Sequence, residues 1–162
     1  MRDALRKTIS AICLTATLSC GAAPTVIAEG PQIADAPSVL IAVRPSDFKQ
    51  TLVDRLFSNY NDTVRMTRID IEDLADANLD GYDAVVVMGA RMGFLLFSGE
   101  ERRFLKSMKH PEKTVMVMTA AVQDWQWERD DIDVITGASK PEYADFFVAR
   151  LTERLDEILH NR

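Results

Sequence analysis

The chain has 162 residues, and its 25 acidic and 19 basic side chains give a formal net charge of −6. A chain of this length suits one domain around a single core, and its negative charge argues against nucleic acids and anionic membranes as partners. Both cysteines, Cys13 and Cys20, lie near the N-terminus and only two histidines are present, so cysteine catalysis and thiolate or histidine metal centres are poorly supplied.

Residues 1–28 predict a signal peptide. Basic residues at 2, 6 and 7 precede a largely apolar run at 9–18, which is about half as long as a helix that crosses a bilayer. Residues 26–28 then offer small or aliphatic side chains to a signal peptidase. Removal of residues 1–28 changes the formal charge from −6 to −8, because three basic residues and one acidic residue leave. We expect an exported, periplasmic protein with a flexible leader at 29–37.

The segment around Cys20 offers a second route of processing. Residues 17–21 (Thr-Leu-Ser-Cys-Gly) resemble a lipoprotein processing site, although Thr17 stands where leucine is usual. Lipidation of Cys20 would hold the same domain on a membrane surface without spanning it. The sequence therefore leaves two locations open, the periplasm and a membrane-anchored lipoprotein.

The expected domain, residues 38–162, alternates apolar strands with amphipathic helices. Continuous apolar runs are typical of strands buried on both faces, and shorter or more polar runs suit the edges of a sheet. Buried strands are predicted at 39–43, 82–89 and 114–119, and edge-like strands at 64–71 and 132–136. Helical spacing of apolar residues predicts helices at 48–60, 104–108 and 143–159, with Ser46, Ser98 and Ser139 as N-caps. This alternation predicts a mostly parallel sheet with right-handed crossovers.

The order of residues from 82 to 105 resembles a flavodoxin-type domain. Residues 82–90 (Tyr-Asp-Ala-Val-Val-Val-Met-Gly-Ala) are similar to that family's third strand, and residues 100–105 (Glu-Glu-Arg-Arg-Phe-Leu) to the helix that follows. The resemblance spans nearly all of residues 38–160. It implies an open, doubly wound, three-layer α/β fold with five parallel strands in the order 2-1-3-4-5. It also implies FMN as the cofactor and electron transfer as the function.

Residues 46–51 correspond to the loop with which flavodoxins hold the FMN phosphate. The family pattern places hydroxyl side chains and a glycine at a helix N-terminus, where backbone N–H groups bind phosphate. Ser46 and Thr51 match that pattern, whereas a phenylalanine and Lys49 replace a threonine and the glycine. The resemblance therefore implies phosphate contacts from Ser46, Lys49, Gln50 and Thr51 in a degenerate loop.

Further ligand contacts are expected at the carboxyl ends of the other strands. Ligands of open α/β sheets collect there, near the point where the strand order reverses. The third strand would contribute Ala90, Arg91, Met92 and Gly93, with Arg91 either on the ligand or in a surface ion pair. Trp125, in the connection after the fourth strand, would stack on the flavin ring.

The same connection has a structural interpretation. Residues 122–131 alone link the fourth and fifth strands, which is near the lower limit for a crossover that contains a helix. Trp125 and Trp127 are therefore expected to roof this face of the sheet and to leave its helical cover thin. The stacking of one tryptophan on a flavin is the alternative.

Two functions remain open from the sequence. One is an exported flavodoxin-like protein that binds FMN and transfers electrons. The other is a flavin-free flavodoxin-like module of the cell envelope that binds a protein partner or another ligand; the degenerate loop and the thin cover favour it. A hydrolase is disfavoured, because no cysteine remains after processing and no serine lies in a G-x-S-x-G elbow. The sequence assigns no catalytic residue and no metal site.

Overall fold

The structure, a computed structural model, describes residues 24–91, 99–122 and 125–161. The strands within these residues are β1 (Val26–Glu29), β2 (Ser38–Val43), β3 (Arg65–Asp70), β4 (Ala84–Ala90), β5 (Thr114–Ala120) and β6 (Asp133–Ala138). The α-helices are α1 (Asp47–Asn59), α2 (Gly99–Ser107) and α3 (Ala144–His160). Short 3-10 helices complete the fold: η1 (Ile71–Asp76), η2 (Leu79–Gly81), η3 (Pro111–Lys113) and η4 (Pro141–Tyr143).

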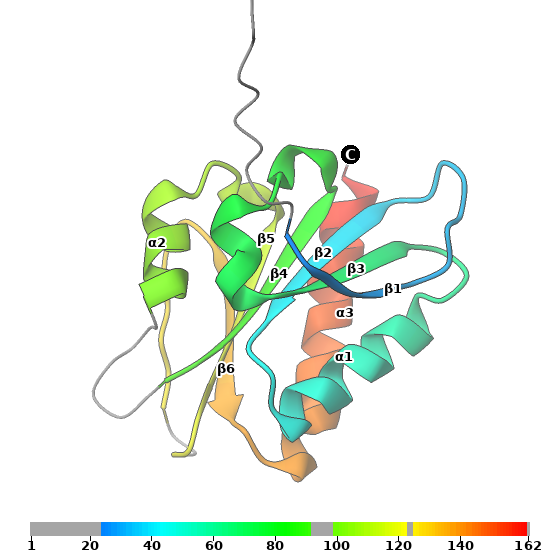
Figure 1. The fold of residues 1–162 in the computed structure, drawn as a ribbon. Helices are drawn as coiled ribbons and strands as arrows, with labels where there is room; N and C mark the ends of the chain where they lie inside the picture. The colour runs from blue at the N-terminus through cyan, green and yellow to red at the C-terminus, as the bar shows by residue number, and fades with distance from the viewer. Residues whose placement is uncertain (1–23, 92–98, 123–124, 162) are drawn as a thin grey trace, which may run out of the picture.

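The strands form one sheet in the order β1-β3-β2-β4-β5-β6 (Figure 1). Neighbouring strands from β3 to β6 are parallel, and β1 alone pairs antiparallel, with β3. The prediction of a mostly parallel α/β sheet is therefore confirmed. The prediction of five strands in the order 2-1-3-4-5 is corrected to six strands, because residues 26–29 add a strand where the sequence indicates a signal peptide and a leader.

β1 lies on the outer side of β3. The paired residues are Val26 with Ile69, Ala28 with Arg68 and Glu29 with Thr67. The mixed polarity of residues 64–71 predicts an edge strand. This prediction is wrong, because β1 extends the sheet beyond β3. Arg68 is only 8% exposed, and its Nη1 donates to Gln50 Oε1 on α1. The polar residues of β3 are therefore not all exposed to solvent, because Arg68 bonds to Gln50 inside the domain.

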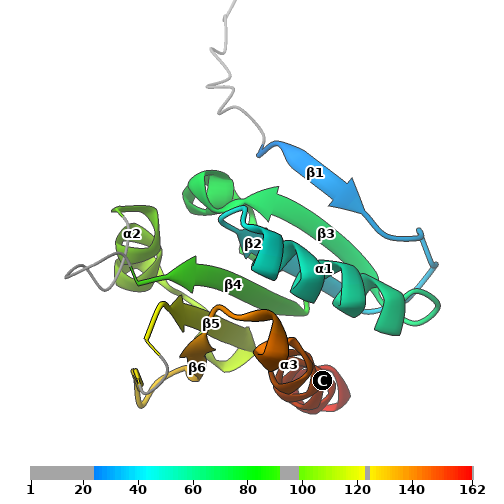
Figure 2. The same cartoon turned by 90° about the horizontal axis from the view of Figure 1, so that it is seen from below.

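Two apolar cores lie on the two faces of the sheet (Figure 2). α1 and α3 cover one face, where Leu52, Leu56, Phe147 and Leu151 are fully buried. η1 and α2 cover the other face. The predicted amphipathic helices therefore bury one apolar side against the sheet and leave the other to solvent.

The second face has little helical cover. The described residues between β5 and β6, 121–122 and 125–132, contain no helix. Trp125 and Trp127 are partly buried and pack against the core of this face instead. The prediction that the tryptophans roof this side of the sheet is confirmed.

The three serines predicted as N-caps have three different outcomes. Ser46 Oγ accepts a hydrogen bond from the Lys49 N–H at 3.3 Å and caps α1, as predicted. Ser139 caps no helix, because its N–H and Oγ donate to Ala120 O at 3.1 and 3.4 Å and join the ends of β5 and β6. Ser98 lies outside the described residues.

Candidate functional site

The candidate site lies at the carboxyl edge of the sheet, where the strand order reverses between β2 and β4. The Arg44 N–H donates to Met88 O at 3.3 Å, and the Arg91 N–H donates to Thr119 O at 2.8 Å. These backbone hydrogen bonds tie the ends of β2, β4 and β5 together. Ligands of open α/β sheets bind at this position, so the predicted site residues can be tested against its geometry.

The two hydroxyl groups expected to hold a phosphate bond to the backbone of α1. Ser46 Oγ accepts the Lys49 N–H, which is one of the donors that a phosphate at this helix would use. Thr51 Oγ donates to Asp47 O at 3.0 Å within the helix. Both groups therefore serve α1 itself.

Gln50 also has partners within the protein. Its Nε2 donates to Asp54 Oδ1 at 2.5 Å, and its Oε1 accepts from Arg68 Nη1. These contacts turn the amide along α1 and toward β3, away from the first turn of the helix. Together with the two hydroxyls, Gln50 therefore has its polar side-chain atoms bonded within the protein.

Lys49 is buried beside a carboxylate rather than presented to a ligand. It is 2% exposed, and Glu101 in the first turn of α2 is 0% exposed. Burial lowers the pKa of Lys49 to about 8; the Glu101 carboxylate opposes this shift and the Arg44 guanidinium adds to it. Lys49 is therefore a buried cation whose charge is influenced by Glu101 and Arg44.

β4 leaves room for Glu101 at Gly89. A Cβ atom on Gly89 would overlap Glu101 Oε1 and would lie 2.8 Å from Met118 Sδ on β5. A side chain at this position would have to displace the end of the Glu101 or Met118 side chain. Gly89 thus leaves the space that the buried Glu101 carboxylate occupies, and the two residues pack together at the carboxyl edge of the sheet.

The positive charge of Arg44 is also balanced. Its Nη2 lies 3.4 Å from Glu100 Oε2, and Glu100 Oε1 lies 3.2 Å from Arg103 Nη2. The Arg44 side chain is 29% exposed in this contact. The first turn of α2 therefore neutralises much of the charge that the end of β2 brings to the edge.

Arg91 and Trp125 are the two predicted site residues that the structure brings together. The Arg91 guanidinium carbon lies 5.7 Å from the centre of the Trp125 ring, which is within the range of a cation–π contact. Both side chains are partly exposed, and Ala90 precedes them at the end of β4. Met92 and Gly93 lie outside the described residues.

A shallow hollow opens beside Arg91. Its volume is about 180 Å³, and it is lined by Arg91, Ala120, Ala121 and Val122. Val122 is 58% exposed, which is high for an aliphatic side chain. The edge therefore offers a guanidinium, an indole ring and a small apolar surface in one place.

No family model and no curated protein matches this chain. The described residues hold no group of three or more histidine, cysteine, aspartate or glutamate side chains placed to bind a metal ion. They also contain no helix with the length and apolar character needed to cross a membrane. The function must therefore be argued from the edge itself and from the other hollows of the domain.

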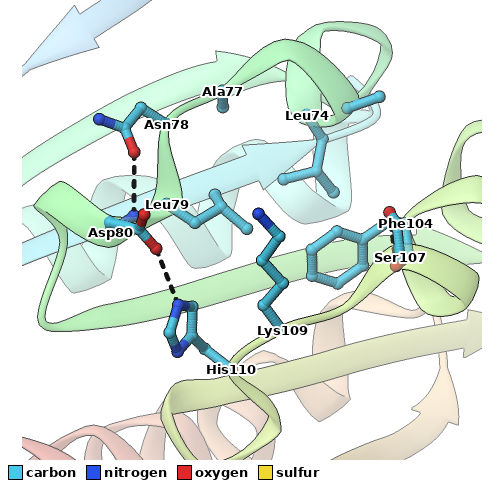
Figure 3. A pocket seen from close by; sticks show the side chains of 10 residues that line it. Leu74, Ala77, Asn78, Leu79, Asp80, Phe104, Ser107, Lys109 and His110 are labelled. Atoms are coloured by element: carbon cyan, nitrogen blue, oxygen red, sulfur yellow. Dashed lines mark hydrogen bonds and ion pairs between the residues drawn. The ribbon is translucent and has the colours of Figure 1, made fainter.

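A pocket that the sequence does not indicate lies between η1, η2 and α2 (Figure 3). Its volume is about 220 Å³, and Leu74, Leu79 and Phe104 give it an apolar wall. His110 Nε2 lies 2.8 Å from Asp80 Oδ1 at its rim, and this hydrogen bond lowers the pKa of Asp80. The pocket forms because two short 3-10 helices, η1 and η2, replace a full crossover helix between β3 and β4. In the sequence, the acidic stretch that follows residue 71 is the only indication of these short helices.

A further hollow of about 330 Å³ lies between the N-terminal halves of α1 and α3. It is lined by Asp47, Phe48, Thr51, Arg55, Ser139, Pro141 and Ala144. Thr51 is the one predicted site residue in this lining, and its hydroxyl already bonds to Asp47 O. Arg55 in this lining pairs with Asp145, and Arg91 and Trp125 remain the predicted site residues that lie in contact.

Proposed function

We propose that the domain is a flavin-free binding module with a flavodoxin-like architecture, which takes its ligand at the carboxyl edge beside Arg91 and Trp125. One observation carries this proposal: the side chains that would hold the FMN phosphate bond to the protein. Ser46 and Thr51 bond to the backbone of α1, and Lys49 is buried beside Glu101. Fold alone does not determine function, so the proposal rests on the site.

The edge favours a small planar anion as the ligand. Arg91 has a planar guanidinium, the kind of group that pairs with a carboxylate, and Trp125 has a flat apolar face. The hollow lined by Ala120, Ala121 and Val122 accepts a group no larger than a small ring, because its volume is about 180 Å³. An aromatic carboxylate has this size, shape and charge.

FMN binding with electron transfer is the competing function. The contact between Arg91 and Trp125 favours it, because both lie at the edge where such sheets bind flat cofactors. The phosphate loop opposes it. The absorption spectrum of protein isolated from the bacterial envelope separates the two functions, together with a fluorescence titration of the purified protein with FMN. A colourless protein that leaves FMN fluorescence unchanged supports the flavin-free module, and a yellow protein with flavin bands contradicts it.

The ligand class is tested by tryptophan fluorescence. We expect benzoate to change the emission of the wild-type protein, and benzamide, which lacks the charge, to have little effect. Arg91→Ala and Trp125→Phe should abolish the change, whereas the matched variant Trp127→Phe should keep it, since the cation–π contact with Arg91 is made by the Trp125 ring. An equal response to benzamide, or no response below about 10 mM benzoate, would contradict the ligand class.

We also propose that this module works in the cell envelope. The signal peptide predicted from residues 1–28 supports a periplasmic location, and lipidation of Cys20 would place the same domain on a membrane surface. Fractionation of cells that express the full chain distinguishes the two. Release by osmotic shock supports the periplasm, and recovery with membranes that detergent dissolves supports a lipid anchor.

A further inference from the structure

The part of the domain that the structure describes begins upstream of Ala28, the cleavage point that the sequence favours. The Thr25 N–H donates to Asp73 Oδ2 at 3.1 Å, and the Gly30 N–H donates to Met66 O at 2.8 Å. Between these two hydrogen bonds, β1 pairs with β3 over residues 26–29. Cleavage after Ala28 would therefore cut within a strand of the sheet.

Such a cut would expose the outer side of β3. Residues 26–28 would be lost, along with their pairing to Ile69 and Arg68. β3 would then present a row of unpaired backbone N–H and C=O groups, which is the kind of edge that promotes pairing between chains. The new N-terminus would also place an ammonium group at Glu29, next to Thr67 in the sheet.

We infer that the signal peptide is removed upstream of Thr25, so that the mature protein keeps β1. The sequence offers a suitable region, because Ser19, Gly21, Ala22 and Ala23 are small and directly follow the apolar run at 9–18. Small residues at the end of the apolar run are what a signal peptidase requires. Residues 26–28 lie further from that run and belong to the sheet. This inference rests on the expected export of the chain and is independent of the ligand.

The intact mass of the exported protein tests the inference. The full chain, with a C-terminal affinity tag, is expressed in a bacterial host, recovered from the envelope and weighed by mass spectrometry. We expect a mature chain that begins between Cys20 and Thr25, either unmodified or with acyl groups on Cys20. A chain that begins at Val26 or later, or one that keeps Met1, overturns the inference.

The substitution Ala28→Thr sharpens this test. Threonine suits a strand, and it is a poor residue before a signal-peptidase cut, which needs a small side chain such as alanine. If processing occurs upstream, the variant matures at the same residue as the wild type. If processing occurs after Ala28, the variant starts at a different residue or remains unprocessed, and the inference fails.

A second measurement asks whether β1 belongs to the domain. Two chains, which begin at Pro24 and at Glu29, are produced without a signal peptide and compared by thermal unfolding. Loss of the pairing between β1 and β3 should lower the unfolding midpoint of the shorter chain by about 4 °C or more. Equal midpoints would show that the domain does not need β1 and would remove the basis of the inference.

Discussion

The substitution Gly89→Ala tests the packing of the carboxyl edge most directly. Gly89 lies in β4, and an added Cβ would overlap Glu101 Oε1 and lie 2.8 Å from Met118 Sδ. Glu101 and Met118 are both fully buried, so neither side chain can move into solvent to make room. The new methyl group must therefore displace β5, α2 or the carboxylate itself.

The expected cost follows from the fixed neighbours of Gly89. An extra carbon in a packed core destabilises a protein by about 1–3 kcal/mol. The lower chain entropy of alanine in the unfolded state offsets this by at most about 1 kcal/mol. The atoms that the new methyl group would meet are at the ends of the Glu101 and Met118 side chains, so a shift of these side chains keeps the cost within this range. We expect a net loss of about 1–3 kcal/mol in the free energy of unfolding.

Urea unfolding followed by circular dichroism measures this loss. With a slope of about 2 kcal/mol per molar urea, a loss of about 2 kcal/mol moves the midpoint by roughly 1 M. Gly81→Ala and Gly99→Ala are matched controls, because a Cβ at either position meets nothing within 4 Å. Both controls should stay within about 0.5–1 kcal/mol of the wild type. If Gly89→Ala also lies within about 0.5 kcal/mol of the wild type, the described packing of Gly89 against Glu101 is refuted.

Substitutions at three further positions test other contacts by the same urea assay. Burial lowers the pKa of Lys49 from its ordinary value of 10.5 to about 8 in the folded protein. The unfolded chain therefore holds the proton more tightly, and stability rises with pH between these two values. Lys49→Met should remove about 2 kcal/mol of this rise between about pH 7.5 and 9.5, and an unchanged pH profile would contradict the burial of the ammonium. Tyr60→Phe removes a hydrogen bond of 2.7 Å to Asp156 Oδ1 and should cost about 1–2 kcal/mol; no loss would mean that water takes the place of the hydroxyl at Asp156 without penalty. Ser46→Ala removes the cap of α1 and should cost about 1 kcal/mol, whereas Ser46→Asp, which can cap in its place, should recover most of it.

The sequence predicts the parallel part of the sheet well because burial on both faces leaves a strong pattern. Residues 39–43, 84–88 and 115–118 are apolar without interruption and are buried throughout. A helix with one apolar side follows the first strand and another follows the last. Such segments have few alternatives in water, since each must cover an apolar surface with another.

β1 and the pocket between η1, η2 and α2 leave no such pattern in the sequence. β1 has four residues, three of them exposed, and its place depends on backbone hydrogen bonds to β3 that no side-chain periodicity encodes. The pocket depends on how far η1 and η2 stand from α2, which is a matter of tertiary packing. The apolar residues Leu74, Leu79 and Phe104 predict burial but not an opening between them.

The candidate site is predicted from the sequence only in part. The sequence identifies the carboxyl edge and places Arg91 and Trp125 there, and the structure brings these two side chains into contact. It does not reveal that Lys49 is buried, because a lysine near a helix N-terminus is usually solvated. The burial of Lys49 depends on Glu101, which lies 52 positions further along the sequence. The two residues come near each other only after β4 and α2 have packed.

The location of both tryptophans in one connection makes the two faces of the sheet separately observable. Trp125 and Trp127 are the only tryptophans of the chain, and both pack on the face that α2 shares. The longest helices, α1 and α3, lie on the opposite face and dominate the far-ultraviolet circular dichroism. Intrinsic fluorescence and dichroism therefore report on opposite layers, and coincident transitions would establish that the domain unfolds as a single cooperative unit.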